Sequence, residues 1–428
     1  MIRDHELIRS YLRSVCGQIK AREVHPHIRK ELESHLEELV MEREEAGDNR
    51  EEAVRYAIER MGDPVKVGKD LHAVHKPRMN WPLMIGGLLF ALLGVFAMYL
   101  IDNSMTVRFP LGEKKLVSVA FGLLIMGLLY FIHPRAIQTY SWAIYAAAVG
   151  GMVGNHWLGA TVNGSPSYIS LGWLNLDWVW VSTYLLIVAA PGILIDRAKK
   201  PFFWPITTAV LVLVPLLLYG NLGRIPGLVL YLTALLVMAG SITGKWKRAI
   251  AQTLLPLGAL LVYALQTRPY LADKWSMYVD PNRDPLGAGY MNVQIQRALQ
   301  SAGWFGKEGA MTLRLPEAHN DIVYVFLVHK FGWLAGIILT LGCAGFIGVL
   351  IRSTRSVSDP FGRTLLAGIS TILGFQLGYN VLMSLGIVPL IGVPFPIVSN
   401  GFTHTVAEFA VLGISLAIYR RRHLTLAM

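Results

Sequence analysis

Residues 295–336, IQRALQSAGWFGKEGAMTLRLPEAHNDIVYVFLVHKFGWLAG, contain an abrupt change of character. A long polar loop ends in the motif LPEAHND, and an apolar helix is expected to begin at Asp321. An ionisable side chain at the boundary of an apolar segment is a functional candidate by default. Asp321 is therefore either a cap for the helix N-terminus or a carboxylate that takes part in chemistry.

The composition indicates a protein embedded in a membrane. Hydrophobic residues make up 54% of the 428 residues and charged residues 16%, and both values depart from those of soluble domains. The apolar residues come in blocks close to the ~20 residues that a helix needs to cross a bilayer. We therefore predict an all-α, polytopic membrane protein.

About ten transmembrane helices are predicted after a basic linker at 75–78. Lys and Arg concentrate in alternate loops, and an even number of spans places both termini and most of this charge in the cytoplasm. Orientation in the membrane thus explains the formal charge of +11, and no nucleic-acid partner is expected. The predicted spans lie near 81–101, 115–132, 137–154, 178–195, 203–219, 225–241, 248–266, 321–351, 364–387 and 401–420.

The same topology places a large loop, 267–320, outside the cell. A loop of this length in a compact bundle is usually functional. Its mixture of aromatic and basic residues fits either a binding surface or anchors at the membrane interface. Cys16 and Cys343 lie in different segments, which supports neither a disulfide framework nor a thiolate metal site.

Residues 1–78 are predicted to form a separate soluble helical domain, and residues 79–428 the membrane domain. Ile28, Leu32 and Val40 recur at helical spacing with glutamates between them. The run at 28–64 resembles the small cytoplasmic helical domain that precedes various bacterial permeases and sensor proteins. That resemblance implies a regulatory or docking role. The histidines of this domain match no metal-ligand spacing and are interpreted as surface residues.

Three blocks on the predicted outer face resemble the shape, elongation, division and sporulation (SEDS) family of peptidoglycan glycosyltransferases, the group of FtsW, RodA and SpoVE. The pairing of Leu-Pro-Glu-x-His-x-Asp with a proline-rich hairpin two spans later is specific to that family. The likeness covers the chain from about residue 80 and leaves out the amino-terminal domain. The blocks are NGSPSYISLGWLNLDW (163–178), QIQRALQSAGWFGKEG with LPEAHND (294–321), and PLIGVPFPIVSNG (389–401).

The resemblance implies transfer of a glycan chain from undecaprenyl diphosphate to the 4-hydroxyl of an incoming lipid II sugar. A base must take the hydroxyl proton, and cationic groups must neutralise the diphosphate leaving group. Asp321 matches the essential aspartate of the family and is the candidate base. The candidate substrate-binding residues are Lys307, Arg314, Glu317, His319, Asn380, Pro394, Pro396 and Ser399.

These candidates have different expected roles. Lys307 matches the lysine of the family's glycine turn, and it is assigned to the diphosphate together with Arg314. Glu317 is expected to orient Lys307 or to bind a divalent cation; otherwise no cofactor is predicted. His319 is either a proton shuttle or a structural hydrogen-bonding group. The helix-breaking prolines make 389–401 either a re-entrant segment that lines the substrate cavity or an ordinary external loop.

The sequence also departs from the family pattern. The Gln-Pro-Ser-Glu element is absent, with Asp177 near its place, and His404 lies in the segment that replaces a Tyr-Gly-Gly-Ser-Ser run. His404 and Glu408 share one helix face, which fits a proton path or a mutually satisfied buried pair. The other departures are Asn320, in place of the threonine of the signature, and His329 with Lys330, in place of an acidic pair.

The leading interpretation is a peptidoglycan polymerase that uses lipid II and works with a single-span transpeptidase of the class B penicillin-binding type. The resemblance to the family implies such a partner, since the polymer must be crosslinked and the chain contains no penicillin-binding motif set. Two alternatives stay open. A transporter of lipid-linked precursors would need a central cavity but no catalytic base. An inactive membrane scaffold or sensor would tolerate replacement of Asp321.

Overall fold

The computed structural model describes residues 5–20, 25–75, 79–104, 110–162, 165–171, 174–198, 204–267, 278–306 and 315–422. The chain divides into two compact units. One holds Met1–Met79 with the short segments Ser356–Asp359 and Tyr419–Met428, and the other holds Asn80–Arg355 and Pro360–Ile418. Most of the described residues are helical, which confirms the predicted all-α class.

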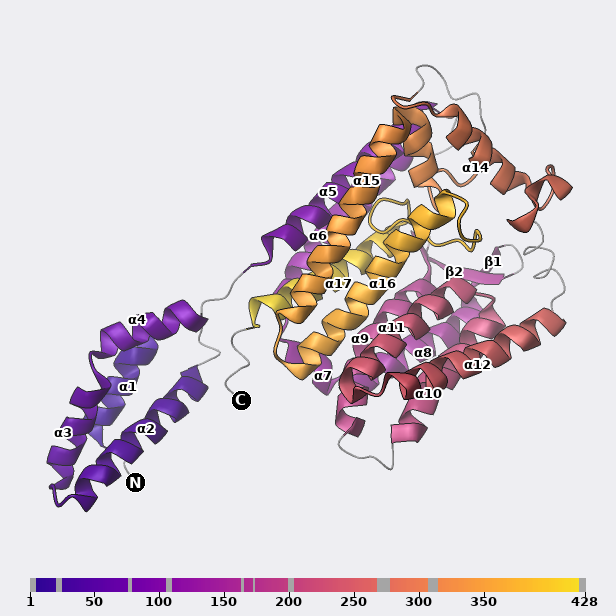
Figure 1. Ribbon diagram of the computed structural model, residues 1–428. Helices are drawn as coiled ribbons and strands as arrows, with labels where there is room; N and C mark the ends of the chain where they lie inside the picture. Colours follow the sequence, from indigo (N-terminus) through magenta and orange to yellow (C-terminus); the bar gives the residue numbers. More distant parts are fainter. Residues whose placement is uncertain are drawn as a thin grey trace. The chain divides into compact units, whose positions relative to one another are not determined.

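The amino-terminal unit is a bundle of helices with its own core (Figure 1). The apolar residues that recur along the second helix, Ile28, Leu32 and Val40, all lie in this core. The helical period predicted from the sequence is therefore confirmed. The helices are α1 (Glu6–Gln18), α2 (His25–Glu45), α3 (Arg50–Met61) and α4 (Pro64–His75).

In the second unit, every segment predicted to span the membrane overlaps a helix of at least 18 residues. Seven of these helices, within the described residues, are long and apolar enough to cross a membrane. The other three are α6, which begins with charged residues, α8, which ends with polar ones, and α12. The seven are α5 (Trp81–Ser104), α9 (Trp178–Ala198), α10 (Trp204–Leu222), α11 (Ile225–Thr243), α15 (Val323–Arg355), α16 (Pro360–Ser384) and α17 (Phe402–Arg420).

The remaining elements of this unit are short or lie between the spans. Helices α9, α11 and α16 contact one another, and α15 packs on both α5 and α16 (Figure 1). Amphipathic α14 (Tyr290–Ser301) lies between α12 and α15 and contacts α15. The bounds are α6 (Leu111–Tyr130), α7 (Pro134–Thr139), α8 (Ser141–Leu158), α12 (Trp246–Thr267), η3 (Pro281–Arg283) and α14 (Tyr290–Ser301).

A small antiparallel sheet precedes α9, in a segment that the sequence predicts only as a loop. Its strands, β1 (Ala160–Val162), β2 (Ser165–Leu171) and β3 (Leu174–Leu176), pair in the order β1-β2-β3. The last pairing, of Ile169 with Leu176, leads the chain directly to Asp177 at the start of α9. The sheet therefore fixes where that carboxylate enters the bundle.

The predicted span 321–351 is interrupted at Gly332. This residue has φ 86° and ψ 174°, so α15 consists of two helical segments, 323–331 and 333–355. The Tyr324 hydroxyl donates to the carbonyl of Gly336 at 3.2 Å. Twelve helical residues rise about 18 Å, which a tyrosine side chain cannot reach across. The first segment therefore folds back along the second, and only the second is long enough to cross a bilayer.

The glycine turn that follows α14 stabilises this break. The first two backbone N–H groups after Gly332 donate to the carbonyls of Gly303 and Trp304 at 3.0 and 3.2 Å. A β-carbon on Gly306 would collide with the carbonyl of Lys330, and one on Gly332 would collide with Trp304. Both glycines also have positive φ, so no other residue fits well at either position.

The proline-rich segment between α16 and α17 is buried within the helix bundle. All residues from 393 to 399 are buried. A β-carbon on Gly94 would lie 2.9 Å from the carbonyl oxygens of Ile397 and Val398. Gly94 is near the middle of α5, about 15 Å from its end, so the segment, here called the proline loop (residues 385–401), enters the bundle. Irregular backbone at that depth requires protein around it, and the contacts with α5 supply part of that environment.

We predict that Gly94→Ala destabilises the protein by roughly 1–3 kcal/mol, because the added methyl group is forced against two backbone carbonyls. Gly127→Ala in α6 is the matched control, since a β-carbon there meets nothing within 4 Å. The control should leave the stability unchanged or raise it slightly, because alanine favours helix over glycine. Thermal unfolding of both variants in detergent measures the difference, and equal Tm values would contradict the packing described here.

Candidate functional site

Asp321 lies in the turn immediately before α15, where it meets α16 and the proline loop. The Nδ2 of Asn380 donates to the backbone carbonyl of Asp321 at 2.7 Å and to the carbonyl of Val393 at 2.7 Å. Asn380 is fully buried, so one amide ties three segments together. The Asp321 carboxylate faces Gly392, where a β-carbon would lie 3.4 Å from Oδ2.

The residues just before Asp321 are bound by the other end of the proline loop. The backbone N–H of Asn400 donates to the carbonyl of His319 at 2.7 Å. The Ser399 hydroxyl donates to the carbonyl of Asn320 and accepts from the N–H of Phe395 at 2.8 Å. Two motifs far apart in sequence thus form one site.

The structure places most of the predicted site residues around this contact. His319, Asp321, Asn380 and Ser399 are linked by the hydrogen bonds above. Among these, Asn380 and Ser399 are buried and act on backbone groups. Pro394 and Pro396 are buried in the same loop. Lys307 and Arg314 lie outside the described residues, directly after and shortly after the glycine turn that packs on α15.

Glu317 is exposed at the edge of the site. Its Oε2 accepts a hydrogen bond from Asn320 Nδ2 at 2.6 Å. Its φ of 58° is left-handed, which costs energy for a residue with a side chain and occurs most often at functional sites. Across the part of the chain that the structure describes, no three His, Cys, Asp or Glu side chains gather as metal ligands. A divalent cation here would need ligands from elsewhere.

Burial makes Asp321 a stronger base than an ordinary aspartate. Loss of solvent around the carboxylate, with the negative charge of Glu317 second, raises the pKa of Asp321 to about 6, while His404 opposes the shift. The shift arises because burial and like charge both disfavour the ionised form. At neutral pH the group is still a carboxylate, and its affinity for a proton is close to that needed for general base catalysis.

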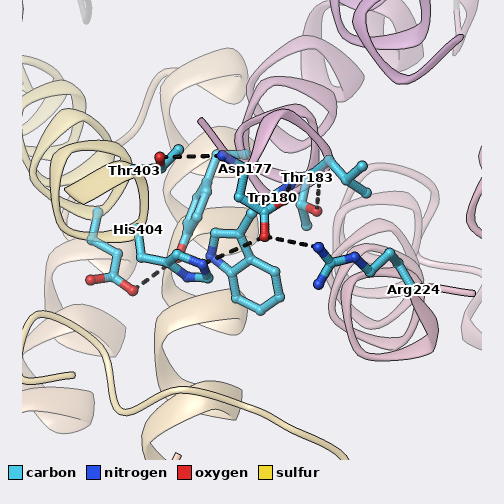
Figure 2. A network of polar contacts seen from close by, with 9 residues as sticks. Asp177, Trp180, Thr183, Arg224, Thr403 and His404 are labelled. Atoms are coloured by element: carbon cyan, nitrogen blue, oxygen red, sulfur yellow. Dashed lines mark hydrogen bonds and ion pairs between the residues drawn. The ribbon is translucent and has the colours of Figure 1, made fainter. Parts of the chain in front are cut away.

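A second polar cluster lies beside this site, and the sequence analysis did not assign it (Figure 2). Asp177 Oδ2 lies 3.3 Å from Arg224 Nη2 and 3.8 Å from His404 Nε2. The His404 ring lies 4.6 Å from the ring of Trp180. The backbone N–H of Trp180 donates to Asp177 Oδ1 at 3.1 Å. The cluster joins the start of α9, the start of α11 and the first turn of α17.

Asp177 is the buried anion of this cluster. Burial raises the pKa of its carboxyl, but the hydrogen bond and charge of His404 and the charge of Arg224 outweigh that effect, so the pKa is lowered. Asp177 therefore stays ionised and holds the Arg224 guanidinium and the His404 imidazole in place. In the sequence, the feature that could have identified Asp177 as a site residue is its position near the missing Gln-Pro-Ser-Glu element.

Two further buried charges hold the end of the proline loop. Lys115 Nζ donates to the Ser399 carbonyl at 2.6 Å and to the Thr405 hydroxyl at 2.8 Å. Glu408 Oε2 accepts the N–H of Ile397 at 2.6 Å. Both side chains are buried, so buried charges are compensated by backbone groups of the loop.

The expectation that His404 and Glu408 satisfy one another is therefore wrong in its geometry. Glu408 binds the proline loop, and His404 faces Asp177. The departure at His329 also has a structural explanation. Its Nδ1 lies 3.0 Å from the carbonyl of Ala298 and 3.2 Å from the hydroxyl of Ser301, which connects α15 to α14.

The fold and the site define a class of protein, a multi-pass helical membrane protein with a half-buried aspartate between the proline loop and an interrupted helix. The family model described as "Cell cycle protein", FtsW/RodA/SpoVE, matches residues 80–424. The chain belongs to this family, which is the SEDS family. It is therefore a multi-pass protein of the cytoplasmic membrane.

Named relatives give the same result. The peptidoglycan glycosyltransferase MrdB of Escherichia coli strain K12 is 28% identical over 353 residues, which cover 78% of this chain and 92% of MrdB. A probable peptidoglycan glycosyltransferase FtsW of Alkalilimnicola ehrlichii is 30% identical over 280 residues, which cover 62% of this chain and 67% of that protein.

Solved structures share the fold. The rod shape determining protein RodA of Thermus thermophilus has a TM-score of 0.60 at 20% identity and covers 80% of this chain and 97% of its own. A chain of a structure concerned with polymerization and crosslinking by a peptidoglycan synthase complex has a TM-score of 0.69 at 23% identity, with coverage of 80% and 98%. At these identities the similarity establishes the architecture.

We predict that Asn380→Ala destabilises the protein by about 1–3 kcal/mol, because two buried carbonyls lose their donor. Thr371→Ala on the same helix is the control, since the Thr371 hydroxyl donates only to the carbonyl of Ala367 one turn earlier. That carbonyl keeps a local helical environment, so the control should change Tm much less. Equal losses in thermal unfolding would show that the Asn380 contacts do not hold the site together.

We predict that Asp321→Asn stabilises the protein above pH 6. The pKa of Asp321 in the folded protein is about 6, above its usual value of 3.8, so the folded state gains stability from protonation and loses it as pH rises from about 4 to 6. Above that window, ionisation costs about 1–3 kcal/mol, which the amide avoids. The Tm difference between variant and wild type should be near zero at pH 4 and positive at pH 8. A pH-independent difference would contradict the shifted pKa.

Proposed function

We propose that this chain is a peptidoglycan glycosyltransferase that polymerises lipid II at the outer face of the bacterial cytoplasmic membrane. The observation that carries the proposal is the setting of Asp321, a half-buried carboxylate of raised pKa held between the LPEAHND turn and the proline loop. Membership of a family whose named members are peptidoglycan glycosyltransferases supplies the reaction class.

In the proposed reaction, Asp321 takes the proton of the 4-hydroxyl of the incoming lipid II sugar. The freed oxygen forms a bond with the anomeric carbon of the growing glycan chain. The bond from that carbon to the diphosphate oxygen breaks, and undecaprenyl diphosphate leaves. A positioned general base contributes about 10²- to 10⁴-fold to such a step.

The other candidate residues support this step in two ways. Lys307 and Arg314 follow the glycine turn and are proposed to neutralise the charge on the leaving diphosphate. Asn380 and Ser399 hold the backbone on both sides of Asp321, and we propose that they keep the carboxylate aimed at the acceptor. His319 and Glu317 lie at the open edge, where a sugar hydroxyl can reach them.

The wider assignments belong to the same proposal. The amino-terminal domain, residues 1–78, is a cytoplasmic regulatory or docking module, residues 79–428 form the membrane domain, and both termini face the cytoplasm. The loop 267–320 then lies outside with the active site. The partner is a single-span transpeptidase of the class B penicillin-binding type, because the glycan product must be crosslinked. The similarity to a chain from a peptidoglycan synthase complex supports this choice of partner.

Polymerisation of labelled lipid II by the purified protein, with and without a candidate transpeptidase, tests the proposal. Asp321→Asn should lower the rate at least about 10²-fold because the base is removed while the shape is kept. Asp196→Asn, which changes an exposed aspartate at the far end of α9, is the control and should retain full activity. Absence of polymer from folded wild type with its partner would favour the transporter or scaffold interpretation.

The pH dependence of the same assay gives a second test. Because the pKa of Asp321 is about 6, the rate should rise with pH through that value as the carboxylate becomes ionised. An ascending limb centred near the ordinary aspartate value would show that the base is a different group or that the site is more hydrated than the structure indicates.

A further inference from the structure

We propose that His404 is a positioning residue for the reaction: its imidazole, fixed by Asp177 and Trp180 at the start of α17 next to the turn that ends in Asp321, supplies a positive charge when it binds a proton and so favours the ionised form of that carboxylate. The inference rests on the proposed role of Asp321 as the base. His404 touches neither substrate nor reacting atoms in this account, so it acts only through Asp321.

The first support is that the position of His404 is over-determined. Its Nε2 lies 3.8 Å from Asp177 Oδ2, and its ring packs on Trp180 at 4.6 Å between centroids. Gly401 lies against the other side, where a β-carbon would come within 3.2 Å of the ring. Figure 2 shows the imidazole beside the Trp180 ring, with a dashed line from it to the Asp177 carboxylate. These contacts restrain the His404 ring to one position and one orientation.

The second support is the path from His404 to Asp321. His404 is in the first turn of α17, directly after the residues that bind the turn before α15. The N–H of Asn400 donates to His319, and the Ser399 hydroxyl donates to Asn320. These contacts hold the beginning of α17 next to the turn that ends in Asp321. In agreement, the charge of His404 lowers the pKa of Asp321, against the larger effect of burial.

The third support is the arrangement of the remaining charges around His404. Asp177 precedes α9, Arg224 precedes α11, and Asp321 with Glu317 precedes α15. Glu408, on the next turn of α17, is held by the proline loop and lies near Lys115. Tyr168 of β2 and Tyr184 of α9 are the nearby phenols. Asp177 is in contact with both Arg224 and His404, and Asp321 is the other carboxylate on which the charge of His404 acts.

His404 and Asp177 are both departures from the family's sequence pattern. His404 lies in the stretch that replaces the family's Tyr-Gly-Gly-Ser-Ser run, and Asp177 lies near the missing Gln-Pro-Ser-Glu element. The two departures are 227 positions apart in the chain, and the structure brings them to 3.8 Å. Two unusual residues that contact one another are better explained by a shared role than by independent loss.

The test is a titration of Asp321 by infrared difference spectroscopy in the full-length protein. The carbonyl band of the protonated carboxyl is identified by its absence in Asp321→Asn, and its midpoint is measured against pH. His404→Gln should move that midpoint upward by roughly 0.5–1 unit, since the positive charge that favours the ionised carboxylate is lost. His404→Lys restores the charge and should bring the midpoint back toward the wild-type value. An unchanged midpoint in His404→Gln overturns the proposal.

Controls separate this role from a structural one. His156→Gln, an exposed histidine whose ring packs on Trp157, should leave the midpoint unchanged. In the polymerisation assay, His404→Gln should lower the rate several-fold near pH 6 and much less at pH 8.5. A uniform loss at every pH would indicate a structural role and overturn the proposal. If His404→Gln does not fold, His404→Asn replaces it as the neutral variant.

The infrared midpoint also keeps the two proposals apart. It requires no lipid II, so it decides the role of His404 even if the wild type makes no polymer. A shifted midpoint without polymerisation would reject the glycosyltransferase assignment and retain the coupling between His404 and Asp321. Polymerisation by the wild type, together with an unchanged midpoint in His404→Gln, would support the glycosyltransferase assignment and reject the coupling between His404 and Asp321.

Discussion

The contact between the LPEAHND turn and the proline loop is the interaction on which the site depends. An irregular loop within a helix bundle must find partners for its backbone groups, since lipid supplies none. Here Asn380, Lys115 and Glu408 bind carbonyls and N–H groups of the loop. Ser399 and Asn400 then bind the turn before α15. The same hydrogen bonds that make the loop tolerable inside the bundle therefore position Asp321.

Loss of solvent around the half-buried Asp321 carboxylate disfavours its ionised form, and this effect makes the group a stronger base. Burial and Glu317 raise the pKa of Asp321, and a more basic carboxylate is a better acceptor for a sugar hydroxyl proton. In the neighbouring cluster, contacts with His404 and Arg224 lower the pKa of Asp177, and the ionised carboxylate holds both side chains in place. Two carboxylates in adjacent surroundings thus have opposite shifts, which is the usual way in which one site assigns different roles to like groups.

Local sequence patterns predicted the all-α class and the helices, and they singled out Asp321 as the candidate base. The break in α15 and the cluster around Asp177 depend on contacts between residues far apart in the chain. The core of the amino-terminal bundle followed from the spacing of Ile28, Leu32 and Val40. The break in α15 was not predicted, because Gly332 in an apolar run is locally unremarkable and its turn depends on distant Gly303. Asp177 resembled an ordinary residue before a helix, since its partners lie on α11 and α17.

A structure of the protein with a non-hydrolysable lipid II analogue in the acceptor position is the most direct test of the central claim. The account predicts that the acceptor 4-hydroxyl lies about 2.6–3.2 Å from a carboxylate oxygen of Asp321, the range for direct proton transfer. An acceptor sugar bound away from Asp321, with another group at that distance from its hydroxyl, would contradict the role given to this residue.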